Sequence, residues 1–148
     1  MKNFKNKVAA ITGAGSGIGQ QLAVLLAKQG CHLSLSDVNA QGLAQTVELL
    51  AKSNVRVTTQ KLDVADRDAM KLWAADTVQH HGSVNMIFNN AGVALGSTVE
   101  GASYEELEWI VNINFWGVVY GTKEFLPLIK KSGEGHVINI SSLFGLTA

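Results

Sequence analysis

The sequence predicts an α/β protein with a doubly wound parallel sheet, in which five strands alternate with flanking helices. Short apolar runs, each about the length of a strand, alternate along the chain with stretches whose apolar residues recur at helical spacing. A glycine-rich turn joins the first strand to the first helix and reads Thr12-Gly13-Ala14-Gly15-Ser16-Gly17-Ile18-Gly19. Strands that alternate with helices form parallel sheets covered by helices on both faces.

The elements are expected in a regular order. The strands are predicted at 8–12, 32–37, 55–62, 84–89 and 136–141. The first helix runs from the glycine turn to Gly30, and the second is capped by Asn39. The third extends from about Asp66 to Gly82, and the fourth from the capping-box spacing at 103–106 towards Lys131. Pro127 is expected to kink or end this fourth helix.

Composition limits the class of protein. A chain of 148 residues with 47% hydrophobic and 16% charged residues fits one globular domain, spanning residues 1–148. The net charge is zero, so no nucleic-acid partner is expected, and no apolar stretch is long enough for a membrane span. The N-terminus lacks the pattern of a secretory signal, and Cys31 is the single cysteine. We therefore expect a reduced, cytoplasmic protein.

The glycine turn predicts a dinucleotide site. Glycines let a backbone turn tightly and approach a phosphate, and the helix behind adds unpaired N–H groups. Asp37 ends the second strand 18 residues after Gly19, where a carboxylate accepts hydrogen bonds from an adenosine ribose. It also repels a 2′-phosphate, and its neighbours Ser16 and Val38 carry no positive charge, so NAD is favoured over NADP. The alternative is that Asp37 is only a solvated charge at a strand end.

Five motifs in this order resemble those of the short-chain dehydrogenase/reductase family, which has a Rossmann-type fold. They are the glycine turn, Asp63-Val64, Asn89-Asn90-Ala91-Gly92, Asn114 within Ile113-Asn114-Phe115-Trp116-Gly117, and Ile138-Asn139-Ile140-Ser141-Ser142-Leu143-Phe144-Gly145. The resemblance covers essentially the whole chain. It implies an oxidoreductase that transfers a hydride between a nicotinamide and a small alcohol or carbonyl substrate.

The resemblance also assigns roles to residues. The predicted cofactor-binding residues are Gly13, Ser16, Gly17, Ile18, Gly19, Asp37, Asp63, Val64, Asn90, Ala91 and Gly92. The implied catalytic residues are Ser142, which would bond the substrate oxygen, and Asn114, which would hold a water of a proton relay at a local break in the helix. Two plainer alternatives remain: a strand-end serine that satisfies backbone groups, and an asparagine bonded to its own helix.

The sequence departs from the family pattern at one point. The family's catalytic tyrosine, with a lysine four residues later, would follow Ser142, but the sequence ends at Ala148 without that pair. Tyr120 and Lys123 have the wrong spacing and precede the last strand. We therefore expect the C-terminal part of the fold to be absent, the chain alone to be catalytically incomplete, and the last strand to be an exposed apolar edge.

The sequence is also compatible with functions other than catalysis. A non-catalytic nucleotide-binding module and an inert fragment are the alternatives to an oxidoreductase. The four histidines are scattered without a metal-ligand spacing, so no metal is expected. The three tryptophans are interpreted as packing residues, and a homo-oligomer is expected for the full-length form.

Overall fold

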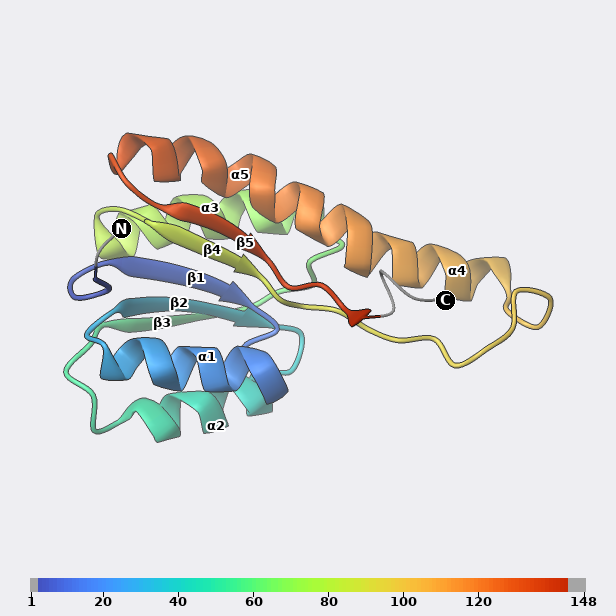
Figure 1. The fold of residues 1–148 in the computed structure, drawn as a ribbon, viewed down its shortest axis with the longest axis horizontal. Helices are drawn as coiled ribbons and strands as arrows, with labels where there is room; N and C mark the ends of the chain where they lie inside the picture. Colours follow the sequence, from blue (N-terminus) through green and yellow to red (C-terminus); the bar gives the residue numbers. More distant parts are fainter. Residues whose placement is uncertain (1–2, 144–148) are drawn as a thin grey trace.

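The computed structural model describes residues 3–143 as a five-stranded sheet in the order β3-β2-β1-β4-β5 (Figure 1). Every neighbouring pair of strands is parallel. Helices α1 and α2 cover one face of the sheet, and α3 and α5 cover the other. The predicted doubly wound parallel sheet is confirmed.

The elements follow one another as the sequence predicts. The strands are β1 (Val8–Thr12), β2 (His32–Asp37), β3 (Val57–Lys61), β4 (Met86–Asn89) and β5 (His136–Asn139). The helices are α1 (Gly17–Lys28), α2 (Ala40–Leu50), α3 (Arg67–His81), α4 (Tyr104–Val111), the π-helical segment η1 (Asn112–Trp116) and α5 (Gly117–Lys131).

The central strand β1 is buried along its whole length, and its side chains alternate between two cores. Ala9 and Ile11 pack with the apolar residues of β2, α1 and α2, whereas Val8 and Ala10 pack with those of α3 and α5. This alternation is the two-residue period of a strand buried on both faces. The two cores hold the carboxyl ends of the strands together at one edge.

The long helix predicted after residue 103 is interrupted around Asn114, where the family resemblance implies a local break. It is divided into α4, the π-helical η1 and α5, and α5 continues through Pro127 to Lys131. The capping box at Ser103 and Glu106 is present as predicted. The apolar spacing alone runs on through this segment and gave no sign of the π-helical turn.

Strand β5 is an edge strand among the described residues, as expected. Its apolar residues Val137 and Ile138 are half-buried rather than exposed, because α5 and β4 cover part of them. Trp73 is buried in the core, but Trp109 and Trp116 are 45% and 41% exposed, so the packing interpretation holds only for Trp73. Within residues 3–143, no helix is long and apolar enough to cross a membrane.

Candidate functional site

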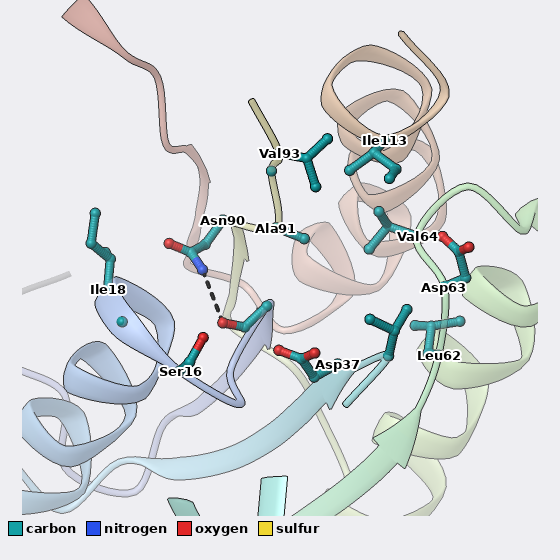
Figure 2. Close-up of a pocket in the computed structure, with 14 residues that line it drawn as sticks. Ser16, Ile18, Asp37, Leu62, Asp63, Val64, Asn90, Ala91, Val93 and Ile113 are labelled. Carbon is teal, nitrogen blue, oxygen red and sulfur yellow. Dashed lines mark hydrogen bonds between the residues drawn. The ribbon is translucent and has the colours of Figure 1, made fainter. Parts of the chain in front are cut away.

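A pocket of about 360 Å³ lies at the carboxyl ends of the strands, beside β1 (Figure 2). The connection from β1 leads to β2 on one side, and β4 lies on the other, so the pocket is at the point where the strand order reverses. The residues that line it are Gly13, Ser16, Gly17, Ile18, Asp37, Val38, Leu62, Asp63, Val64, Asn90, Ala91, Gly92, Val93 and Ile113. The fold therefore gathers all the predicted cofactor-binding residues except Gly19 in one concave site.

The glycines of the turn have different structural tasks. Gly13 has φ +65°, and a Cβ there would be 2.9 Å from the Cα of Ala91. Gly17 has φ +52° and faces open space, so a ligand can approach its backbone. Gly19 lies behind the turn, where a Cβ would be 2.1 Å from the carbonyl oxygen of Gly13. Its role in the structure is close packing of α1 against the turn.

Asp37 holds the turn as well as facing the pocket. Its Oδ2 accepts a hydrogen bond from the backbone N–H of Gly15 at 2.8 Å, and its Oδ1 accepts one from Asn39 at 2.9 Å. The side chain is half-buried and points into the pocket beside Leu62 (Figure 2). A negative charge is thus fixed at the end of β2, with carboxylate lone pairs left for a further donor.

The end of β4 is bonded to the turn through Thr12 and Asn90. The Asn90 amide donates to the carbonyl oxygen of Thr12 at 2.9 Å. It also donates to that of Gly13 at 3.3 Å (Figure 2). The Thr12 hydroxyl oxygen accepts from the backbone N–H groups of Asn90 at 2.9 Å and Ala91 at 3.0 Å. Thr12 was not among the predicted site residues, although a hydroxyl between a strand and a glycine turn is a usable signal.

The opposite wall of the pocket is formed after β3. Asp63 is exposed and accepts a hydrogen bond from Ala65 N–H at 2.9 Å, which fixes the carboxylate at the rim. Val64 is buried, and a Cβ on Gly117 would be 2.7 Å from its side chain. Ile18 and Asp63 lie on opposite sides of the site (Figure 2).

Asn114 is bonded to the loop after β4. Its side chain accepts from Val93 N–H at 2.9 Å and donates to the Val93 carbonyl at 2.8 Å. The alternative of an asparagine buried and bonded to its own helix is wrong, because Asn114 is exposed and its side chain bonds to Val93 in the loop. The π-helical turn η1 contains Asn114, and such turns are frequent at functional sites.

Ser142 lies just beyond β5 and is exposed, and it is not one of the residues that line the pocket. The structure therefore does not bring Ser142 into the same cavity as the glycine turn. Gly145, the last residue of the predicted serine segment, and Ala148 lie outside the described residues.

The remaining chemically reactive side chains lie elsewhere. Cys31 is buried, and burial raises the pKa of its thiol to about 12, so it is unreactive at neutral pH. Tyr120 packs against the core beside α3 and stacks on Trp116, with ring centroids 5.7 Å apart. Across residues 3–143, no cluster of three histidine, cysteine or acidic residues could hold a metal ion.

Comparison with known proteins agrees with this geometry. The family model described as short chain dehydrogenase matches residues 7–148. The "Putative oxidoreductase SadH" of Mycobacterium tuberculosis is 49% identical over 148 residues, which are 100% of this chain and 54% of that protein. The "Cyclohexanol dehydrogenase" of Acinetobacter sp. is 35% identical over 145 residues, or 97% of this chain and 57% of that protein. The chain thus spans about half the length of these relatives.

Solved structures give the same result. A short chain dehydrogenase/reductase from Burkholderia phymatum, in complex with NAD, superimposes with a TM-score of 0.96 at 35% identity. The match covers 100% of this chain and 53% of that one. The fold and the site define a protein of the doubly wound α/β class with a pocket at the switch point of its sheet. The chain belongs to the short-chain dehydrogenase/reductase family.

Proposed function

We propose that residues 1–148 form the dinucleotide-binding domain of an oxidoreductase that transfers a hydride between a nicotinamide cofactor and a small alcohol or carbonyl compound. The observation that carries the proposal is the pocket at the switch point, which gathers the glycine turn, Asp37 and the end of β4. Relatives that share the whole of this region are described as oxidoreductases and dehydrogenases.

The residues present fit a dinucleotide. The backbone at Gly17 is open, and a substituent there would meet nothing within 4 Å, which leaves room for a pyrophosphate. The turn leads directly into α1, whose first N–H groups and positive dipole end favour a phosphate. Ser16 precedes the helix without a side-chain capping bond, so its hydroxyl is not committed to α1. The fit supports a dinucleotide cofactor.

Each wall of the pocket has a separate task in this proposal. Ser16, Gly17 and Ile18 bind the phosphates, and Asp37 accepts hydrogen bonds from the adenosine ribose. Asp63 and Val64 flank the adenine, and the backbone at 90–92 borders the path towards the nicotinamide. Bound nicotinamide would supply the hydride acceptor or donor.

The two implied catalytic residues remain part of the proposal. Ser142 would orient the substrate oxygen, and Asn114 would hold a relay water at η1. The bonds from Asn114 to Val93 fix the position of its amide at the mouth of the pocket. A homo-oligomeric full-length form and a cytoplasmic location are also proposed, on the family resemblance and the cysteine content.

The preference for NAD over NADP rests on charge. Asp37 is fixed at the place where a ribose would lie, and its neighbours Val38 and Leu62 in the pocket are apolar. A 2′-phosphate would meet this carboxylate without a compensating cation in the pocket lining of the described residues. The same charge can accept from the two ribose hydroxyls of NAD.

Calorimetric titration of the chain with NAD and NADP tests the proposal. We expect the chain to bind NAD at least tenfold more tightly than NADP. In Asp37→Asn, the ratio of the two dissociation constants should be smaller. Asp76→Asn, an exposed carboxylate on α3, is the matched control and should keep the ratio. Equal or tighter binding of NADP would refute the preference, and no binding of either would refute the dinucleotide site.

A further inference from the structure

Helix α2 lies outside the pocket lining yet contacts the glycine turn at two places. Thr46, in its middle, is fully buried, and Gly42, in its first turn, is also buried. Both face the Ala14-Gly15 segment of the turn, which is 27 or more residues earlier in the chain. These contacts belong to no function assigned so far.

Thr46 is bonded to the turn through its hydroxyl. Its Oγ1 donates to the carbonyl oxygen of Ala14 at 2.8 Å, and the Gly42 carbonyl lies at 3.0 Å. A hydroxyl has one proton to donate, and we assign it to the Ala14 carbonyl because that contact is the shorter of the two. Gln20 of α1 donates its amide to the same Oγ1 at 3.0 Å. Thr46 thus joins α2, α1 and the turn at a single buried atom.

Gly42 sets the distance between α2 and the turn. A Cβ at Gly42 would be 2.6 Å from the carbonyl oxygen of Gly15 and 3.1 Å from its carbon. Real Cβ atoms do not approach a backbone oxygen so closely, so any larger residue would displace either α2 or Gly15.

A closed ring of contacts results. Gly15 donates to Asp37 Oδ2, and Asp37 Oδ1 accepts from Asn39 N–H. Asn39 caps α2 by accepting from Gly42 N–H at 3.1 Å, and Gly42 in turn lies against the Gly15 carbonyl. Both backbone groups of Gly15 are therefore located by elements on the β2–α2 side. Ser16 and Gly17, the next two residues, are exposed and open to a ligand.

From this geometry we infer that Thr46 and Gly42 are positioning residues for the phosphates of the cofactor, acting through Ala14 and Gly15 on the backbone at Ser16-Gly17. The inference rests on the dinucleotide site proposed above. A backbone anion site gains affinity when its N–H groups are already ordered before the ligand arrives. Neither residue touches the ligand in this role.

The test compares binding of ADP with binding of adenosine, which has the same base and ribose but no phosphates. Thr46→Val removes the hydroxyl at nearly constant volume, Thr46→Ser restores it, and Thr59→Val is a control on the exposed part of β3. We expect Thr46→Val to weaken ADP binding at least tenfold and to change adenosine binding less than twofold. Thr46→Ser and Thr59→Val should bind both ligands as the unaltered chain does.

Gly42→Ala gives a second route if Thr46→Val does not fold. Alanine favours a helix more than glycine, so a loss of affinity there cannot come from a weaker α2. We expect the same selective loss of ADP binding, with Gly96→Ala, which meets open space, as the control. Unchanged ADP affinity, or equal losses of ADP and adenosine, would overturn the inference while leaving the proposed function intact. If the unaltered chain bound neither ADP nor NAD, the proposed function would fail and this inference with it.

Discussion

The helices beside the glycine turn and the helical segment after residue 103 differ in how many of their residues are buried. Helices α1 and α2 on the nucleotide side, residues 8–61, each bury four residues against the sheet or the turn. On the C-terminal side, residues 104–116, α4 and η1 bury none, and Trp109, Phe115 and Trp116 are exposed. The nucleotide side therefore obtains its order from contacts within this chain. The C-terminal side contributes Asn114 from an exposed surface.

The largest expected difference between the two sides is in stability. Leu35→Ala on β2 removes a fully buried side chain, and we expect it to lower the free energy of unfolding by about 4 kcal/mol. Trp109→Ala on α4 removes a larger but exposed side chain and should change it by no more than about 0.5 kcal/mol. Urea unfolding followed by circular dichroism measures both. A cost for Trp109→Ala as large as that for Leu35→Ala would contradict the comparison.

The second-largest effect on stability is expected at Gly19, between the glycine turn and α1. In Gly19→Ala the new methyl would be 2.1 Å from the Gly13 carbonyl oxygen, so α1 or the turn must move. We expect a loss of about 3 kcal/mol in the free energy of unfolding and of measurable NAD binding. Gly96→Ala, in open space after β4, is the control and should be neutral for both. Normal NAD binding by Gly19→Ala would mean that the turn is not held as rigidly as its contacts indicate.

The parts of the molecule that sequence could predict are those determined by neighbouring residues. The glycine turn, the Asn39 cap and the capping box at Ser103 all act over three or four positions, and the structure has them as predicted. The left-handed Gly82 that ends α3 is another such signal. Sequence placed these features correctly because their physics is local.

The parts that sequence missed depend on distant partners. The two hydrogen bonds between Asn114 and Val93 join residues that are 21 positions apart. Thr46 looks like any residue on a helix until α2 packs on the turn, where its hydroxyl meets the Ala14 carbonyl. The exposure of Trp109 and Trp116 is likewise invisible in their spacing, which is that of ordinary helix residues. These features depend on which distant segments pack together, and the spacing of residues in one sequence does not indicate that.

A pH effect is expected on the side of the sheet that α3 covers. His81 is buried, its Nε2 is 2.9 Å from the Thr58 hydroxyl, and its Nδ1 has no hydrogen-bond partner. Burial, with the charge of Arg56 nearby, lowers the pKa of His81 to about 4 from 6.5. Because the folded pKa lies below the unfolded one, folding favours the neutral form, and stability falls as the pH drops below about 6.5.

The expected loss from His81 between pH 6.5 and pH 5 is about 1.5 kcal/mol in the free energy of unfolding. The measurement is urea unfolding at both pH values, with His81→Gln compared with the unaltered chain. His81→Gln should lose less of its free energy of unfolding between the two pH values. His80 is an exposed neighbour, and His80→Gln should lose as much as the unaltered chain. An unchanged pH dependence in His81→Gln would show that another group titrates. In that case the packing of α3 against β3 would not depend on His81 being neutral.

The smallest expected effect is at the contact between the C-terminal side and the loop after β4, where Asn114 meets Val93. Asn114→Ala removes two hydrogen bonds at an exposed position, which should cost about 1 kcal/mol locally and leave global stability nearly unchanged. We therefore expect the Val93 amide to exchange with deuterium about fivefold faster, while amides of β1 exchange at their former rate. Asn112→Ala, in the same π-helical segment, is the control. If the Val93 amide kept its rate in Asn114→Ala, the loop after β4 would be ordered by β4 alone. Asn114 would then be free to act on a ligand without disturbing the pocket wall.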